Sequence, residues 1–260
     1  QSDTILFNGH LFTENQNITS ISITNNQDLT IPNTAFDNCK NLKCITFSTR
    51  STLTISKDSF NQLQFLANIV LSGNKIIIED NCFNECVNSK VNANSFFATQ
   101  IINIQSYSFV EIGNNCFNKM INLELFEVLG TFVKIGNYCF NQCSSLSTVN
   151  ILRASEILIN KYCFNECYKI STITFTYVSF VEIKSGSFIG CENITKLTIT
   201  PSKYANVIKC FESIEQIENG NYLYEFIAQK SEQSDKFLID CYYYFKWLTQ
   251  DMKRTHEYIQ

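Results

Sequence analysis

The apolar positions of this chain recur at a fixed period over most of its 260 residues. A phenylalanine returns every 23 or 24 residues, with a single gap of 34. The repeating phenylalanines are Phe12, Phe36, Phe60, Phe83, Phe117, Phe140, Phe164, Phe188 and Phe211. A period in this range indicates a solenoid, because one short repeat buries its apolar face only by stacking on its neighbours.

Within each repeat, the apolar residues keep the same distances from the phenylalanine, which we number as position 0. They fall at −7, −5, +3, +6, +9 and +11, which around Phe164 are Ile157, Ile159, Cys167, Ile170, Ile173 and Phe175. A spacing of two predicts a short strand with alternate residues buried. The −7/−5 and +9/+11 pairs therefore predict two strands per repeat, and the spacing of three between them predicts one helical turn or a tight bend.

The gap of 34 residues follows Phe83 and indicates an insertion. The strand pattern resumes at Ile102 and Ile104, so the extra residues lie within 87–99. Lengthening a surface loop costs little free energy, and insertions in repeat arrays often lie on a binding face. The insertion is therefore either a tolerated surface loop or part of a binding surface.

Two stretches carry a family resemblance, IGNNCFNKMINLELFEV from Ile112 and IGNYCFNQCSSLSTVNI from Ile135. They resemble the BspA-like subclass of leucine-rich repeats, which occurs in bacterial and protist surface proteins, and the resemblance extends over about residues 5 to 211. Leu63 and Met120 depart from the pattern, because they replace the +3 cysteine. The resemblance implies a curved parallel-sheet solenoid with an adhesion or recognition role, and it transfers no catalytic residues.

The expected fold is a mainly β, leucine-rich-repeat-like solenoid, a right-handed curved array of about eight to nine repeats. It is predicted to cover residues 1–218 and to be followed by a helical segment over 219–260. In this segment Phe237, Cys241, Tyr244 and Leu248 recur at spacings of three and four, which is typical of a helix. Such a helix would cap the last repeat or link it to a further domain, and its run of tyrosines from 242 to 244 is an alternative contact for a partner.

Ten of the twelve cysteines occupy position −1 or +3 of a repeat. Free cysteine behaves as a small buried apolar residue, so this phase predicts packed, reduced thiols. Disulfides are the alternative. Metal binding is disfavoured because only two histidines are present and the cysteine pairs are spaced more widely than in zinc knuckles.

The remaining composition argues against several functional classes. The net charge is −4 without a basic run, which disfavours nucleic acid as a partner. No apolar stretch is long enough to predict a transmembrane helix. His10 and His256 lack the surroundings of a catalytic base, and no glycine-rich phosphate loop is present. We therefore predict no enzymatic activity, no cofactor and no metal, and a β-helix carbohydrate-active enzyme is the less favoured enzyme alternative.

The sequence favours a recognition or adhesion module, a cell-surface or secreted antigen that binds extracellular proteins or glycans. The sequons at Asn17 and Asn193 are weak support for secretion. The alternative is an intracellular, cytoplasmic scaffold for protein–protein interaction with the same fold. The chain is expected to be a monomer.

The binding surface is expected on the concave sheet, where +10 and +12 point outward because +9 and +11 point inward. This gives a hydroxyl-rich stripe with a single charge that suits a protein or glycan partner, although threonine is also a common exposed strand residue. The candidate residues are Thr46, Ser48, Asn103, Gln105, Glu127, Asn150, Thr174, Thr176, Thr198 and Thr200.

Overall fold

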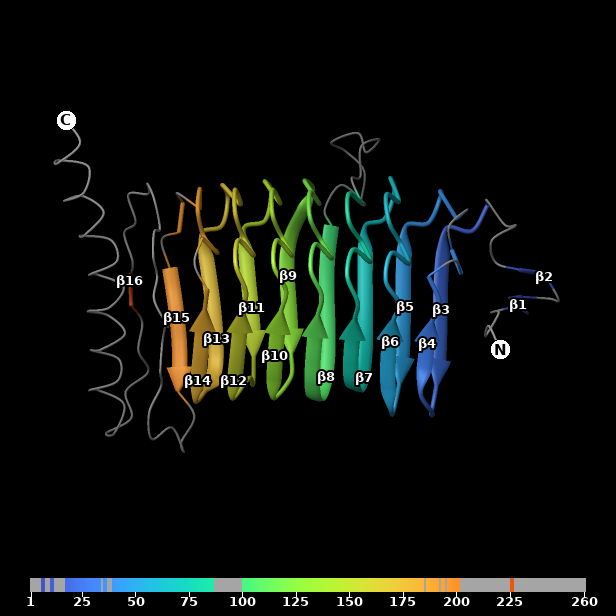
Figure 1. Ribbon diagram of the computed structural model, residues 1–260, viewed down its shortest axis with the longest axis horizontal. Coiled ribbons are helices and arrows are strands. Elements are labelled where there is room, and N and C mark those ends of the chain that lie inside the picture. Colours follow the sequence, from blue (N-terminus) through green and yellow to red (C-terminus); the bar gives the residue numbers. More distant parts are fainter. Residues whose placement is uncertain are drawn as a thin grey trace.

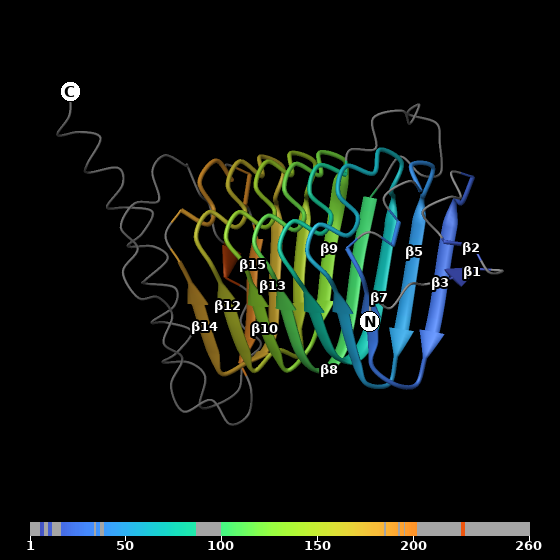
Figure 2. The same cartoon turned by 45° about the vertical axis from the view of Figure 1, so that its right-hand side comes forward.

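The computed structural model describes a β-solenoid in which each repeat contributes a strand to each of two sheets (Figures 1 and 2). It covers residues 17–33, 35–36, 39–86, 100–184, 186–191, 193–194 and 196–201, with the strand residues 6–7, 10–11 and 225–226. About six turns, each near 24 residues long, make up this part of the chain. No α-helix occurs among the described residues.

The first sheet contains the strands around the predicted +9/+11 pairs, and its neighbours are parallel. Its strands are β3 (Ser20–Asn25), β5 (Cys44–Thr49), the first part of β7 (Asn68–Ile78) and of β8 (Gln100–Ile112), β9 (Leu123–Leu129), β11 (Thr148–Leu152), β13 (Thr172–Val178), β15 (Lys196–Pro201) and β16 (Glu225–Phe226). A separate antiparallel pair joins β1 (Leu6–Phe7) to β2 (His10–Leu11).

The second sheet contains the strands around the −7/−5 pairs, which are also parallel. Its strands are β4 (Leu29–Ile31), β6 (Thr52–Ile55), the last parts of β7 and β8, β10 (Phe132–Ile135), β12 (Glu156–Ile159) and β14 (Phe180–Ile183). Because β7 and β8 run through both sheets, the two sheets are continuous at these strands. Both predicted strands of the repeat are thus confirmed.

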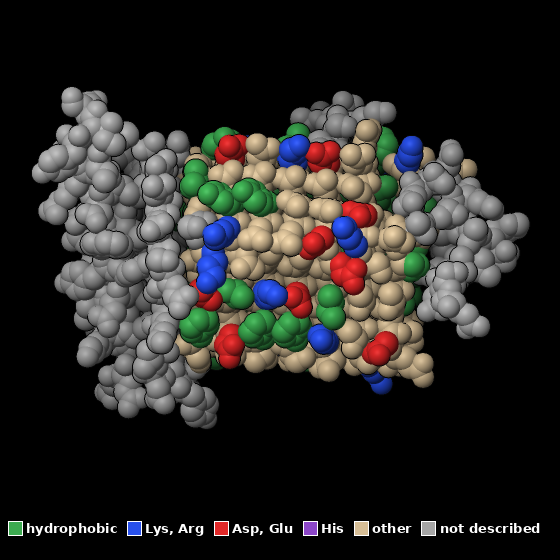
Figure 3. Space-filling model, viewed as in Figure 1, with side chains coloured by type: hydrophobic (Ala, Val, Ile, Leu, Met, Phe, Trp, Pro, Cys, Tyr) green, Lys and Arg blue, Asp and Glu red, His purple; other side chains and the backbone are tan. Residues whose placement is uncertain are grey.

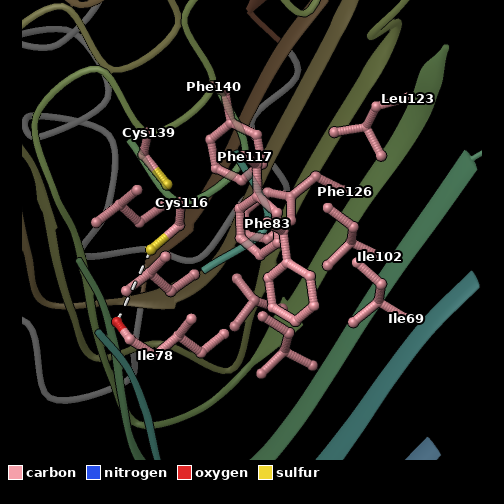
Figure 4. Close-up of a cluster of buried hydrophobic side chains, with 14 of the residues drawn as sticks. Ile69, Ile78, Phe83, Ile102, Cys116, Phe117, Leu123, Phe126, Cys139 and Phe140 are labelled. Carbon is pink, nitrogen blue, oxygen red and sulfur yellow. Dashed lines mark hydrogen bonds between the residues drawn. The ribbon is translucent and has the colours of Figure 1, made fainter. Parts of the chain in front are cut away.

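The core lies between the sheets and contains the column of repeat phenylalanines, part of which Figure 4 shows. From Phe36 to Phe188, each ring stacks on the next at centroid distances of 5.1 to 5.4 Å. The pair Phe83–Phe117 is stacked at 5.4 Å although the insertion separates the two residues in sequence. The predicted column is confirmed for these rings, with Phe188 only partly buried, whereas Phe12 lies outside the described residues.

The third side of the solenoid consists of tight turns that are also joined by backbone hydrogen bonds. From Phe60 to Phe164, the N–H of each repeat phenylalanine donates to the carbonyl at −1 of the next repeat, as from Phe140 to Cys163 at 2.7 Å. Positions −2 and +2 have positive φ, for example 53° at Tyr138 and 60° at Gln142. This conformation is unfavourable for residues with a Cβ, so the hydrogen bonds between repeats stabilise it.

Asparagines at position +1 form a second set of contacts along this side. The amide of Asn118 donates to Asn84 and the amide of Asn141 donates to Asn118, each at 2.8 Å. Asn165 continues the series by donating to Asn141 at 2.7 Å. Side-chain amides therefore join the same turns that the backbone joins.

The cysteines fill the space between these turns and the core. At position +3 the thiol donates to the carbonyl of the preceding repeat phenylalanine, from Cys143 to Phe117 and from Cys167 to Phe140 at 3.0 Å each. In the column at −1, the thiol of Cys116 donates to the carbonyl oxygen of Glu79 at 2.9 Å. Cysteine is small and carries a donor, which explains its recurrence here.

One part of the predicted helical tail is wrong. Glu225–Phe226 form strand β16, which pairs in parallel with β15, instead of a helix. The open edge of β15 offers unpaired backbone groups, and pairing with them outweighs a local helical pattern. The remainder of 219–260 and the predicted insertion at 87–99 lie outside the described residues.

Candidate functional site

The outer face of the first sheet carries the predicted binding residues in straight rows. Inward side chains such as Phe47, Ile104 and Ile151 are fully buried, and the residues between them point outward. Strand register aligns the +10 residues from Thr46 across to Thr198. The outward residues Thr46, Ser48, Asn103, Glu127, Asn150, Thr174, Thr176 and Thr198 are half-buried, Gln105 is exposed, and the side chain of Thr200 lies outside the described part.

The centre of this face is a hydrogen-bonded triad on three adjacent strands, formed by Asn103, Glu127 and Asn150. The Asn103 Nδ2 donates to Glu127 Oε1 at 3.4 Å, and Asn150 Nδ2 donates to Glu127 Oε2 at 3.3 Å. One carboxylate thus accepts from both flanking amides. All three residues were predicted to lie on one face, and the in-register strands bring them into contact.

An acceptor in this triad has no donor. The Asn103 Oδ1 is buried and is the one buried side-chain oxygen or nitrogen without a hydrogen-bond partner among the described residues. Leaving a buried polar atom unpaired costs roughly 1–3 kcal/mol, and buried polar groups in native proteins are rarely left so. The atom is therefore a place where a donor from outside the chain would be stabilised.

Apolar side chains frame the triad, and part of this frame is absent from the predicted stripe. Val70 occupies the +10 row beside Asn103 and is 39% exposed. Position +8 adds a third outward row, in which Ile101 is 37% exposed and Leu125 is half-buried. The alternation of buried and outward residues predicts this row as well, because a strand with +9 and +11 inside also places +8 outside.

The buried cysteines do not form a reactive site. All ten cysteines of the described residues are free thiols, and all of these except Cys44 are buried. Burial raises the pKa of the Cys86 thiol to about 12 and that of Cys139 to about 11. With these raised pKa values, the two thiols are predominantly protonated near neutral pH. They are unreactive because the thiolate, not the thiol, is the nucleophile.

We expect only one cysteine of the described residues to react rapidly with iodoacetamide in the native protein. Cys44 lies half-buried on the outer face of the first sheet, whereas the other nine are buried. Mass spectrometry before and after unfolding in urea measures the labelling. Rapid native labelling of Cys143 or Cys167, or pairs of masses that are linked by disulfides, would contradict the prediction of packed, reduced thiols.

No group of three or more His, Cys, Asp or Glu among the described residues is placed to hold a metal ion. Within these residues there is also no helix with the length and apolarity of a membrane span. His10 lies in β2, in the separate antiparallel pair with β1, and His256 lies outside the described part.

The parallel strands, the buried phenylalanine column and the repeat period define a leucine-rich-repeat solenoid. The family model of the BspA-type leucine-rich repeat region matches residues 6–111 and 110–229, with six copies. The chain therefore belongs to the BspA-type leucine-rich repeat family. Proteins of this family typically take part in protein interaction or adhesion and are typically not enzymes. They are commonly secreted or located at the surface. No curated protein and no solved structure matches the chain.

Proposed function

We propose that this protein is a non-enzymatic recognition module that binds a protein partner on the outer face of the first sheet. The observation that carries the proposal is the buried, unpaired Asn103 Oδ1 beside the Glu127 carboxylate. Both atoms accept hydrogen bonds, so the partner is expected to contribute donors, such as an arginine or lysine side chain or backbone N–H groups.

The surroundings of the triad support a protein as the partner. Val70, Ile101 and Leu125 offer apolar contact area around a polar centre. A polar contact framed by residues that exclude water is typical of the energetically important part of a protein interface. With Glu127 as the one charge in the outward +10 and +12 rows from Thr46 to Thr176, binding is expected to depend only weakly on salt.

We place this function at the cell surface or in the extracellular space. Family membership and the exposed sequon asparagines Asn17 and Asn193 support this location. Antibody staining of unpermeabilised cells distinguishes it from a cytoplasmic scaffold, because only a surface protein is stained without permeabilisation.

Replacing Asn103, Glu127, Asn150 and Thr174 together with arginine should abolish partner binding without unfolding the chain. The four side chains point outward, so the substitutions insert bulk and positive charge where the partner is expected to place its donors. Arrays of purified extracellular proteins and of glycans, probed with labelled protein, measure binding. We expect at least about a tenfold loss on the proteins that the unmodified chain binds.

The control variant carries arginine at Gln64 and Tyr168, which are exposed on the turn side, and should bind normally. Circular dichroism checks that both variants are folded. Unchanged binding by the quadruple variant would exclude this face. Binding to glycans alone would overturn the assignment to protein partners.

A further inference from the structure

The outer face of the second sheet has a composition unlike that of the first sheet. It mixes aromatic, aliphatic and oppositely charged side chains, which Figure 3 shows as green, blue and red groups side by side. Position −8 contributes one row across β7, β8, β10 and β12, formed by Lys75, Phe109, Phe132 and Glu156. Position −6 contributes a parallel row on the same strands, formed by Ile77, Glu111, Lys134 and Leu158. These two rows are called the second-sheet patch below.

The aromatic rings of this patch are arranged for contact with another apolar surface. Phe109 and Phe132 stack on each other with centroids 5.0 Å apart and planes inclined by 5°. The Lys75 ammonium lies 5.1 Å from the centre of the Phe109 ring. Both faces of the Phe109 ring are therefore covered, by Lys75 on one side and by Phe132 on the other.

Each row is self-complementary. When its order of residues is reversed about a line between β8 and β10, charged residues fall opposite residues of opposite charge and apolar residues fall opposite apolar residues. Reversal brings Lys75 opposite Glu156 in the first row and Phe109 opposite Phe132. In the second row it brings Glu111 opposite Lys134 and Ile77 opposite Leu158. One strand further out on each side, Thr54 falls opposite Glu182 and Thr52 falls opposite Phe180.

From this symmetry we infer that the second-sheet patch binds a second copy of the same chain. The two copies pack face to face across a two-fold axis that runs parallel to the strands, between β8 and β10. Interfaces of this kind use the same surface of both subunits and must be self-complementary. The two Glu111–Lys134 ion pairs, each 2.7 Å long within its own chain, then lie against each other with opposite signs adjacent.

A different two-fold axis, parallel to the solenoid axis, fits the charges poorly. Placed between the two rows, it would bring each −8 residue opposite the −6 residue of its own strand, so the Phe109 ring would face Glu111 and the Phe132 ring would face Lys134. Placed along the −6 row, it would bring Glu111 opposite Glu111 and Lys134 opposite Lys134. Like charges in an interface cost several kcal/mol. The charge pattern therefore selects one orientation of the two copies.

The patch is small, which limits the affinity. Four strands about 4.8 Å apart give a footprint well below the roughly 800 Å² per partner of a standard interface. The dimer is accordingly expected to be weak and concentration-dependent, in contrast to the monomer that the sequence favours. Because the first sheet lies on the opposite side of the solenoid, this pairing leaves both partner-binding faces free (Figure 2).

Charge reversal at Lys75 and Glu156 tests the proposed dimer. Sedimentation equilibrium of the full chain from about 1 µM to about 500 µM measures the dimer dissociation constant. We expect K75E alone and E156K alone each to raise this constant at least about tenfold, because each creates two like-charge contacts. The double variant K75E/E156K restores opposite charges at both contacts and should dimerise like the unmodified chain, although it lacks the Lys75–Phe109 contact.

Mixing the two single variants gives the most specific result. In a mixed pair, both contacts join a glutamate to a lysine, so K75E and E156K should form a heterodimer while each remains monomeric alone. Uniform nitrogen-15 labelling of one variant separates the two masses, so native mass spectrometry distinguishes the heterodimer from both homodimers. The control Glu124→Lys changes an exposed carboxylate in β9, outside the patch, and should leave dimerisation unchanged. A purely monomeric unmodified chain at the highest concentration, or single variants that fail to pair on mixing, would overturn the proposal.

Discussion

Replacing Phe140 with alanine should lower the free energy of unfolding by about 3–5 kcal/mol, the usual range for a buried phenylalanine. Its ring is fully buried and packs against three other rings, two of the column and one of the first sheet. The centroid distances are 5.1 Å to Phe117, 5.1 Å to Phe164 and 4.4 Å to Phe126. Truncation removes a ring from the middle of a continuous stack, and rings held on both sides by in-register strands have little freedom to close the cavity.

Urea denaturation followed by circular dichroism measures the change in stability. Phe188→Ala is the matched control, because this ring is only partly buried and has one stacked neighbour among the described residues. It should cost clearly less than Phe140→Ala. Equal costs at the two positions would contradict a column whose stability depends on contact with both neighbouring repeats.

Replacing Gly136 with alanine should be nearly as damaging, at about 3 kcal/mol, because its backbone packs directly against the backbone of the preceding repeat. A Cβ on Gly136 would lie 2.4 Å from the carbonyl carbon of Gly113 and 2.5 Å from its oxygen. These are backbone atoms, so no side-chain rotation relieves the overlap. Relief requires the two repeats to separate, which also strains the hydrogen bond from Gly136 N–H to the Ile112 carbonyl at 2.8 Å.

The control for this substitution is Gly73→Ala. The nearest atom to a Cβ there is the Lys75 carbonyl oxygen at 3.2 Å, so small shifts are enough. Urea denaturation of both variants, with hydrogen exchange at the neighbouring strands, compares the effects. A Gly136→Ala protein as stable as Gly73→Ala would show that the turn at 136 is free to move outward.

Most of the architecture could be predicted because one period sets the register of every strand. Once the repeat phenylalanines are aligned, Ile102 and Ile104 must stack on Ile69 and Leu71, and the structure pairs them in this way. The alternation of buried and outward residues then follows from strand geometry. The outward direction of Asn103, Glu127 and Asn150 was predictable for the same reason.

The conformation of the turns was not predictable from this alternation. Tyr138 and Gln142 adopt positive φ only because the neighbouring repeats accept and donate hydrogen bonds there. One turn does carry a sequence signal for positive φ. In the last described turn, Gly186 and Gly190 occupy the same −2 and +2 positions with φ of 73° and 76°. Glycine tolerates this region, so it marked a conformation that the other repeats reach with larger residues.

The details of the candidate site depend on side-chain contacts across strands and were likewise beyond the sequence. The Asn103 Oδ1 is unpaired because the Nδ2 of the same amide donates to Glu127. A single repeat does not specify this contact. Strand β16 depends on an edge that only the assembled sheet offers. Both features arise between repeats, where a period gives the alignment of residues but not their interactions.

The hydrogen bonds of all three sides run along the solenoid axis, and this direction determines how the molecule responds to mechanical load. A pull between the two ends of the array acts along these bonds and opens the terminal repeats first, because each of them is held by a neighbour on one side only. A pull along the strands loads many bonds together in shear. The solenoid is therefore compliant as a tether between its ends and stiff across its width, so the direction in which an attached partner pulls decides whether the array extends or holds.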